Sequence, residues 1–353
     1  MPQISSAEDK AFWLLPQPRL PWFAVHKREL PWREDREPYH IWLSEIMLQQ
    51  TRVEAVKGYY SRFLQALPSI SALAQAPEDL LLKLWEGLGY YSRVRNLQKA
   101  ARKILQEHGG SFPREYAAIL ALPGIGAYTA GAISSICFEA PKAAVDGNVL
   151  RVLSRFEADA ADISLEQTKK QAARRLEAIY PEGNCGDFTQ ALMELGATVC
   201  VPNGAPLCDQ CPLQAHCKAR QAGNQLKFPV KAPKKPRRQE DRTVLILLRD
   251  NKIALCKRPK KGLLAGLWQL PDVTGKLETQ AALDLAESWG LRPTDLLQMQ
   301  EKIHIFTHIT WNLRGYYLRC VGEGSFQWFD RSELNEQIGL PTAYRQFLDT
   351  IQF

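Results

Sequence analysis

The feature that most constrains this chain is a change in its hydrophobic pattern between residues 224 and 242. Before this stretch, apolar residues recur at helical spacing, as in EDLLLKLWEGL and TKKQAARRLEAIY. After it, β-branched and aromatic runs such as TVLILLRD, KIALCKRP and HIFTHITWNLRGYYLRCV are typical of strands, with helical patterns at QAALDLAES and TAYRQFLDTI. The sequence therefore predicts an all-α N-terminal domain, residues 1–223, and a small α+β C-terminal domain, residues 243–353.

Residues 224–242 read NQLKFPVKAPKKPRRQEDR, which is rich in Pro, Lys and Arg and poor in apolar residues. This composition predicts a solvated, partly extended linker, and the alternative is a basic strap that lies on a phosphate backbone. Over all 353 residues, 45 Lys and Arg exceed 38 Asp and Glu by seven. This modest excess permits an anionic partner but does not by itself select nucleic acid.

Four of the eight cysteines, Cys200, Cys208, Cys211 and Cys217, lie within 18 positions. The N-terminus lacks a signal-peptide pattern and no apolar run is long enough for a membrane span, so we expect a cytoplasmic chain without a membrane partner. Clustered cysteines in that compartment indicate a metal or iron–sulfur site. Zinc modules usually contain two Cys-x2-Cys pairs, whereas here only one pair has that spacing. The loop 200–217 therefore favours a 4Fe-4S cluster over zinc.

The segment LPGIGAYTAGAI, residues 122–133, follows one helical stretch and opens another. Gly124 and Gly126 predict a tight turn with positive φ, and backbone N–H groups at the start of the next helix form a site for a phosphate. The small residues that follow allow this helix to approach another backbone closely. The alternative is an ordinary turn between two helices.

Two carboxyl groups have sequence surroundings that suit acid–base chemistry. Asp146 precedes the helical run NVLRVLSRF, so it is an N-cap whose charged form the helix stabilises. Glu45 shares a helical stripe with Ile41, Trp42 and Leu48, where poor solvation would raise its pKa. The alternatives are a purely structural cap for Asp146 and a solvent-facing side chain for Glu45. Two carboxyls with divergent pKa values are the usual pattern in glycosidic bond chemistry.

These features in this order resemble the endonuclease III superfamily of DNA glycosylases, and within it the adenine DNA glycosylase family. The resemblance covers roughly residues 20–220 and implies an all-helical domain with a helix-hairpin-helix, a catalytic Asp and a 4Fe-4S cluster. The segments that carry it are LPWR (30–33), WLSEIMLQQT (42–51), WEGLGYYSRVRNL (85–97), LPGIGAYTAGAI, VDGNV (145–149) and the cysteine loop.

The resemblance implies a role for each matching residue. Glu45 protonates N7 of adenine, Asp146 stabilises the oxocarbenium ion of the sugar, and Tyr128 and Asn148 orient these carboxyls. Family members that also cut the strand carry a Lys at the position of Tyr128, where it forms a Schiff base. We therefore expect a monofunctional enzyme with little or no lyase activity.

The resemblance also implies how the DNA is read. Gln50 and Tyr90 wedge into the base stack and replace the stacking lost when adenine is flipped out. In the C-terminal half, GLLAGLWQLP (262–271) and HIFTH (304–308) resemble the Nudix-like domain that inspects 8-oxoguanine. The family often shows Phe-Ser-His, whereas this chain has Phe306, Thr307 and His308. The stretch DVTGKLETQAALDLAES lacks the Glu-rich helix of a working Nudix hydrolase, so we expect no nucleotide hydrolysis.

The expected partner is double-stranded DNA with an adenine:8-oxoguanine or adenine:guanine mispair, bound by a monomer in the cytoplasm, or at the nucleoid in a bacterium. The alternatives are a glycosylase and lyase for oxidised pyrimidines, a non-catalytic iron–sulfur protein that binds DNA, and a Nudix hydrolase with a helical extension. Tyr128 and the C-terminal domain argue against the first, and the matching contexts of Glu45 and Asp146 argue against the second.

Overall fold

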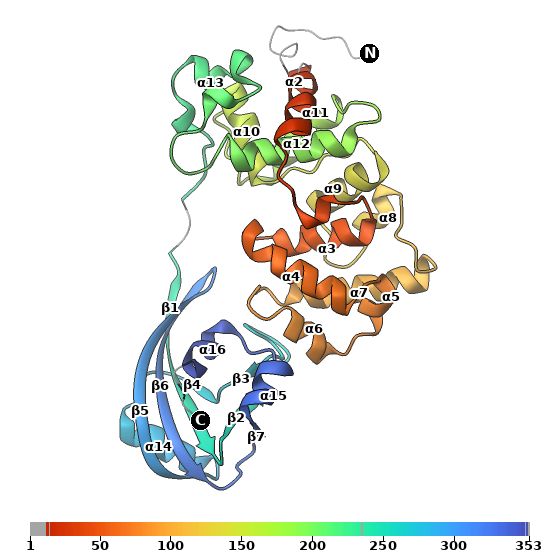
Figure 1. The fold of residues 1–353 in the computed structure, drawn as a ribbon. Helices are drawn as coiled ribbons and strands as arrows, with labels where there is room; N and C mark the ends of the chain where they lie inside the picture. The colour runs from red at the N-terminus through yellow and green to blue at the C-terminus, as the bar shows by residue number, and fades with distance from the viewer. Residues whose placement is uncertain (1–11, 14, 234–235, 350, 352–353) are drawn as a thin grey trace. The chain divides into compact units, whose positions relative to one another are not determined.

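The computed structural model describes residues 12–13, 15–233, 236–349 and 351. The chain divides into two compact units, of which the first comprises residues 1–75 and 96–233. The second comprises residues 76–95 and 234–353, so that a stretch from the helical half groups with the C-terminal domain. Figure 1 traces both units, and each is described separately below.

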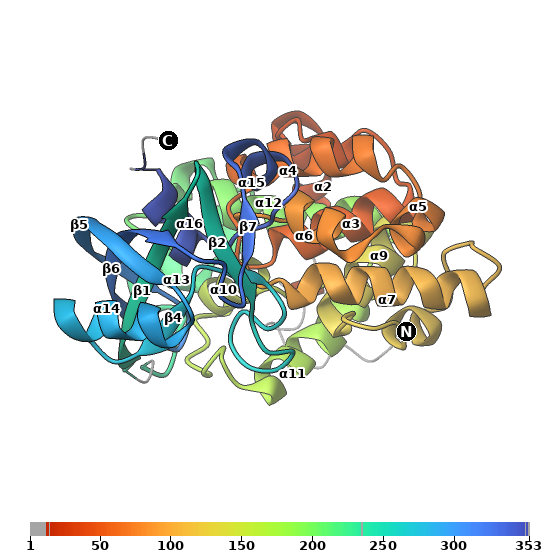
Figure 2. The ribbon, with the colours of Figure 1, turned by 90° about the horizontal axis from the view of Figure 1, so that it is seen from below.

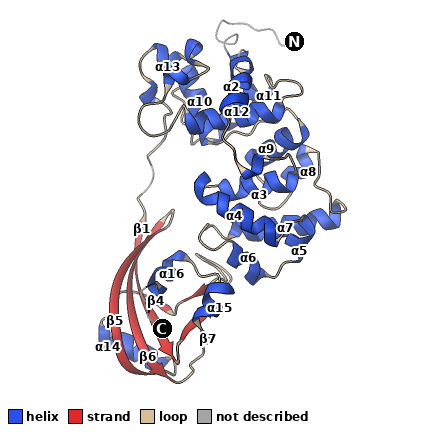
Figure 3. Cartoon of the chain, viewed as in Figure 1, coloured by secondary structure: helices blue, strands red, loops and turns tan. Residues whose placement is uncertain are grey.

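The first unit is built from helices, as the sequence predicts (Figure 3). One helix, α7, begins among residues of the second unit and continues in the first. The helices are α2 (Pro16–His26), α3 (Pro38–Leu48), α4 (Val53–Ala66), α5 (Ile70–Gln75), α7 (Ser92–Glu107), α8 (Tyr116–Leu120), α9 (Ala127–Phe138), α10 (Gly147–Glu157), α11 (Glu166–Glu177), α12 (Cys185–Thr198) and α13 (Lys218–Gln221), with short 3-10 turns η1 (Pro31–Arg33), η2 (Cys208–Gln210), η3 (Gln214–His216) and η4 (Gln225–Lys227).

Helix α12 packs against α2, α9 and α10. Glycines allow the closest of these approaches. A Cβ on Gly131 of α9 would lie 2.2 Å from the carbonyl oxygen of Ala143, just before α10. A Cβ on Gly186 of α12 would lie 3.0 Å from Cα of Ile136 on α9. The small residues of LPGIGAYTAGAI therefore bring α9 against the segment that leads into α10.

The second unit contains a mixed sheet with helices on both faces. Its strands follow the order β3-β2-β1-β6-β5, in which β1 and β6 are parallel and β5 and β6 form a long antiparallel hairpin. The elements are α6 (Glu78–Leu84), β1 (Arg238–Arg249), β2 (Lys252–Lys257), β3 (Trp268–Gln269), β4 (Asp272–Thr274), α14 (Thr279–Ser288), β5 (Arg292–Ile305), β6 (Ile309–Val321), β7 (Gln327–Phe329), α15 (Arg331–Glu336) and α16 (Thr342–Leu348).

Two apolar clusters hold the helices to this sheet. On one face, Trp311 and Leu313 of β6 pack with Tyr344 and Phe347 of α16. On the other face, Tyr316 of β6 belongs to a cluster that includes residues of α14, and Figure 2 shows α14 along the strands. The α+β class predicted from the sequence is therefore confirmed.

Three details of this unit differ from the pattern in the sequence. Strand β1 begins at Arg238, inside the segment 224–242 that the composition assigns to the linker. The single run 304–321 is divided by the hairpin tip at residues 306–308. The first half of β5 has no alternating apolar pattern because nearly all of its side chains are exposed or half-buried. Among the described residues, no helix is long and apolar enough to cross a membrane.

Gly131→Ala tests the close approach of α9. The new methyl group would collide with a backbone carbonyl, so we expect a loss of about 1–3 kcal/mol in the free energy of unfolding. The measurement is the urea midpoint of the helical signal. Gly58→Ala, at an exposed position of α4 where only a flexible Arg62 side chain is near, should instead gain up to about 1 kcal/mol. Equal effects of the two substitutions would contradict this account.

Candidate active site and cysteine loop

A cavity of about 620 Å³ in the first unit contains the two carboxyls that the sequence singles out. Its wall is formed by α3, the segment after it, α9, the start of α10 and α12. Glu45, Tyr128, Asp146 and Asn148 all line it, together with Gln50. The volume lies in the range of ordinary ligand sites.

Glu45 projects from α3, a helix that is buried on nearly all sides, and only 6% of the residue is exposed. The hydroxyl of Tyr128 on α9 donates a hydrogen bond to its Oε2 at 2.6 Å. Burial raises the pKa of Glu45 to about 7, although the Tyr128 hydrogen bond and the charge of Arg33 oppose this rise. Near neutral pH, this carboxyl therefore carries a proton in a large fraction of molecules.

Asp146 is the N-cap of α10, as its position in the sequence predicts. Its Oδ1 accepts a hydrogen bond from the Val149 N–H at 2.8 Å, and its Oδ2 accepts one from Nδ2 of Asn148 at 2.7 Å. Burial raises the pKa of Asp146 above its usual value, and these hydrogen bonds oppose the rise. Burial therefore acts against the stabilisation that the helix N-terminus gives to the charged form of Asp146.

Asn148 is itself fixed by a second layer of contacts. The Nη2 group of Arg151 donates to Oδ1 of Asn148 at 2.8 Å and to the carbonyl of Gly196 at 2.7 Å. The Nε group of Arg151 donates to the carbonyl of Cys200 at 2.7 Å. A Cβ at Gly196 would lie only 2.6 Å from that of Asn148, so α12 is pressed directly against the start of α10.

One side of the same cavity is lined by Glu194, Arg28 and Arg33, and the sequence did not predict this charged cluster. Glu194 of α12 has a side chain that is 0% exposed, and it accepts hydrogen bonds from Arg28 at 2.7 and 2.8 Å and from Arg33 at 2.9 Å. Burial alone would raise its pKa, but the hydrogen bonds from the two arginines lower the pKa of Glu194 to about 2. The ionised Glu194 thus holds both guanidinium groups in place at the wall of the cavity.

The sequence does contain one indication of this charged cluster, because Glu194 is a lone carboxylate in the apolar run QALMELGATV, residues 190–199. A charge in such a run requires a partner. The partners lie far away in the sequence, with Arg33 inside the segment LPWR.

The turn between α8 and α9 exposes Gly124, Gly126 and Ala127, while Leu122 and Ile125 are buried beneath it. Gly124 has a φ of 79°, and a Cβ there would meet Asn96 at 2.6 Å, so this position requires glycine. Gly126 is the N-cap of α9 with a φ of −100°, so the expected positive φ is wrong at this position. The first N–H groups of α9 lack helical partners, as at every helix start.

Gln50 and Tyr90, the two expected wedge residues, are both exposed and both lie in the left-handed region, with φ of 60° and 47°. This region is strained for side chains of this kind and is often found at functional positions. Within the second unit, the Tyr90 hydroxyl is hydrogen-bonded to the Thr307 hydroxyl at the tip of the β5–β6 hairpin. Thr307 and His308 are exposed, whereas Phe306 packs on Trp311 with ring centroids 4.9 Å apart.

The four clustered cysteines surround one small cavity of about 30 Å³ and carry free thiols. Side-chain N–H groups point at two of the sulfurs, from Arg155 to Cys200 at 3.4 Å and from Gln225 to Cys208 at 3.7 Å. No three His, Cys, Asp or Glu side chains in the described part of the chain converge closely enough for a single metal ion. Four thiols around a common space, with hydrogen bonds to sulfur, are a donor set that an iron–sulfur cluster can use.

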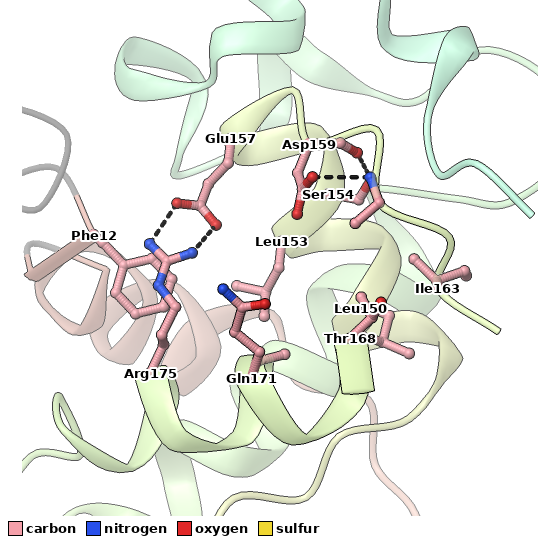
Figure 4. A pocket seen from close by; sticks show the side chains of 12 residues that line it. Phe12, Leu150, Leu153, Ser154, Glu157, Asp159, Ile163, Thr168, Gln171 and Arg175 are labelled. Carbon is pink, nitrogen blue, oxygen red and sulfur yellow. Dashed lines mark hydrogen bonds and ion pairs between the residues drawn. The ribbon is translucent and has the colours of Figure 1, made fainter. Parts of the chain in front are cut away.

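A further pocket lies between α10 and α11 (Figure 4). Its volume is about 40 Å³, and the ion pair between Glu157 and Arg175, at 2.6 Å, crosses one side of it. This space is far smaller than the cavity that contains Glu45, and it contains none of the expected site residues.

Comparisons with known proteins show which family this chain belongs to. Residues 43–182 match the model of the HhH-GPD superfamily of base excision DNA repair proteins, and residues 243–350 match the NUDIX domain. The chain is 38% identical to human adenine DNA glycosylase over 86% of its length, and 31% identical to that of Buchnera aphidicola subsp. Schizaphis graminum over 94%. It spans 66% of the human protein and 96% of the Buchnera protein. The chain belongs to the adenine DNA glycosylase family.

Solved structures support the fold of the first unit. A thermostable thymine-DNA glycosylase matches with a TM-score of 0.56 and 29% identity, and covers 62% of this chain and 100% of that one. A non-covalent endonuclease III–DNA complex matches with a TM-score of 0.52 and 22% identity over 62% of this chain and 98% of that one, which supports the fold alone.

Glu45→Gln tests the raised pKa without an activity measurement. In the folded chain Glu45 has a pKa of about 7, above its value of 4.5 when exposed, so its ionisation destabilises the fold as pH rises from 4.5 to 7. We expect the variant to exceed the wild type in stability by up to about 3 kcal/mol at pH 8, and by much less at pH 5. Urea midpoints at both pH values measure this difference. Glu182→Gln, at an exposed position, should change neither midpoint, and a pH-independent effect of Glu45→Gln would contradict the assignment.

Proposed function

We propose that this chain is a monomeric, cytoplasmic DNA repair enzyme that flips adenine out of a mispair with 8-oxoguanine or guanine and hydrolyses its N-glycosidic bond. The observation that carries the proposal is the pair of buried carboxyls in one cavity. Glu45 accepts a single hydroxyl hydrogen bond, whereas Asp146 accepts hydrogen bonds from a helix N–H and an amide. This difference in donors favours the proton on Glu45 and the negative charge on Asp146.

In the proposed mechanism, Glu45 donates its proton to N7 of adenine and so makes the base a better leaving group. Asp146 then stabilises the positive charge that develops on the sugar. Tyr128 and Asn148 fix the orientation of these two carboxyls through the hydrogen bonds described above. Water completes the hydrolysis.

Strand cleavage by a Schiff base requires an amine near the sugar. At the corresponding position this chain has Tyr128, whose hydroxyl is committed to Glu45. We therefore infer that the enzyme releases the base and leaves the DNA backbone intact.

The DNA contacts are assigned to three surfaces. The exposed turn with Gly124 and Gly126 presents the N-terminus of α9 to a backbone phosphate. Gln50 and Tyr90 enter the base stack. Phe306, Thr307 and His308 read 8-oxoguanine, and the hydrogen bond between Tyr90 and Thr307 supports a shared role for Tyr90 and the hairpin tip within the second unit.

We further propose that Cys200, Cys208, Cys211 and Cys217 hold a 4Fe-4S cluster, which would supply structural order to the loop rather than a reaction step. The four thiols around one cavity and their N–H donors support this assignment. In the Nudix-like domain, α14 reads TQAALDLAES and lacks the clustered glutamates that hold magnesium. We propose that this domain recognises DNA and does not hydrolyse nucleotides.

The decisive measurement is single-turnover base release from duplexes with adenine opposite 8-oxoguanine, guanine or thymine. We expect adenine release only from the first two, with strand breaks only after alkali. Glu45→Gln should slow release by about 10²–10⁴-fold and Asp146→Asn by at least about 10²-fold. The wild-type rate should fall as pH rises through about 7, where Glu45 loses its proton. Breaks without alkali, or unchanged release by Asp146→Asn, would reject the mechanism.

Thr307 substitutions test the lesion-reading tip. Thr307 is exposed and its hydroxyl contacts that of Tyr90, so Thr307→Ala should reduce the preference for adenine:8-oxoguanine over adenine:guanine. The loss of one hydrogen bond predicts a reduction of roughly 5- to 10-fold in the ratio of the two rates. Thr307→Ser keeps the hydroxyl and should retain the ratio. If Thr307→Ala leaves the ratio unchanged, this residue does not read the lesion.

A further inference from the structure

The loop that presents Tyr90 joins α6 to α7 and contains several residues with positive φ. Gly87, Gly89 and Tyr90 have φ of 94°, 68° and 47°. Glycine adopts such angles freely, whereas a tyrosine is strained there. Tyr90 is 45% exposed, so the packing of its own side chain does little to fix the loop. A strained and half-exposed residue persists only where neighbouring contacts hold its backbone.

Arg93, in the first turn of α7, provides such contacts. Its Nη2 donates hydrogen bonds to the carbonyls of Leu88 at 2.9 Å and Gly89 at 3.1 Å, and its backbone N–H donates to the carbonyl of Tyr90 at 2.9 Å. Its guanidinium carbon lies 5.6 Å from the centre of the Tyr90 ring and 5.3 Å from that of the Trp85 ring. One residue therefore holds three consecutive carbonyls of the loop and contacts the ring of Tyr90.

The position of Arg93 is unfavourable for α7 considered alone. The residue is only 9% exposed, and burial lowers the pKa of Arg93 to about 10. A cation in the first turn also lies at the positive end of the helix dipole, where acidic side chains are favoured. The charge-assisted hydrogen bonds to the loop carbonyls oppose these costs. The guanidinium therefore serves the loop rather than the helix.

The same loop is held from two other elements of the second unit. Trp85, which follows α6 and is 0% exposed, donates from its Nε1 to the carbonyl of Gly89 at 3.0 Å. The hydroxyl of Tyr90 is hydrogen-bonded to that of Thr307 at the tip of the β5–β6 hairpin. Contacts from α6 and α7 thus fix the backbone of the loop, and the hairpin tip holds the end of the Tyr90 side chain.

We propose that Arg93 is a positioning residue that forms the Tyr90 loop in advance of DNA binding, so that Tyr90 is ready to enter the base stack. This inference rests on the wedge role assigned to Tyr90 under Proposed function. The loop carbonyls are already bound to Arg93, so base extrusion does not have to order this backbone. Without the guanidinium, the loop would reach less strained conformations, and Tyr90 would leave the left-handed region in a part of the molecules.

The test is a double-mutant cycle of Arg93→Met and Tyr90→Ala. Two signals are measured on a duplex with adenine opposite 8-oxoguanine. One is the single-turnover rate of base release, and the other is the fluorescence of a 2-aminopurine base beside the adenine, which increases when stacking is lost. In the chain with Tyr90, Arg93→Met should lower both signals, with a loss of about 10-fold in the rate. In Tyr90→Ala it should change the rate by less than about twofold, because the residue through which Arg93 acts is gone.

Gln98→Met is the matched control on the same helix. Gln98 is 8% exposed, and its Nε2 donates to the carbonyls of Leu73 at 3.3 Å and Ala74 at 3.5 Å, away from the Tyr90 loop. This substitution should lower the urea midpoint without a change in the fluorescence signal. Arg93→Lys keeps the buried charge but not the planar fork of donors, so it should cause a smaller loss in both signals. It replaces Arg93→Met in the cycle if that variant does not fold.

The outcomes separate this inference from the wedge assignment. Unchanged fluorescence and release in Tyr90→Ala would reject the wedge role of Tyr90, and the role of Arg93 with it. A loss in Tyr90→Ala, together with an effect of Arg93→Met that is absent or equal in both backgrounds, would reject only the role of Arg93. A loss of fluorescence in Gln98→Met as large as that in Arg93→Met would also reject it, because it would indicate a general effect on α7.

Discussion

The cap that Asp146 forms on α10 is the interaction on which the rest of the first unit depends. A carboxyl that is buried in a helical core needs donors, and the start of α10 provides the Val149 N–H and the Asn148 amide. Asn148 in turn is held by Arg151, and Arg151 reaches the backbone of Gly196 and Cys200. The position of this carboxyl is therefore fixed by contacts from α10, from α12 and from the first residue of the cysteine loop.

Three carboxyls line one cavity, and their electrostatic states differ because their donors differ. Glu194 accepts charge-assisted hydrogen bonds from two arginines and has a pKa of about 2. Glu45 accepts one hydroxyl hydrogen bond, and burial raises its pKa to about 7. The hydrogen-bond donors of Asp146 are neutral, unlike the arginines at Glu194, but they include the N-terminus of a helix, which Glu45 lacks. Burial is common to all three, so the donor set decides which of them retains a proton.

The parts of the fold that could be predicted from the sequence are those with a local cause. The turn at Gly124, the helix cap at Asp146 and the cysteine loop are each determined by residues close together in the sequence. The helical and strand patterns predicted the class of both domains. The pairing of Arg28 with Glu194 joins residues 166 positions apart, and no local pattern encodes it. Strand β5 was missed because an exposed edge strand lacks the alternation that identifies a half-buried one. The grouping of residues 76–95 with the C-terminal domain is likewise a tertiary property.

Helix α3 holds Glu45, the proton donor of the proposed mechanism, and leads into Gln50, one of the residues proposed to enter the base stack. Its buried body holds Glu45 against Tyr128, and its end leads through Gln49 to Gln50 in the left-handed region. A strained residue persists only where surrounding contacts over-determine it, and here Leu48 and Thr51 close the turn with a backbone hydrogen bond of 3.3 Å. Gln50 of the proposed wedge and the proposed proton donor Glu45 are therefore both attached to α3. Since both are set by the same packing, a displacement of α3 would alter base extrusion and protonation together.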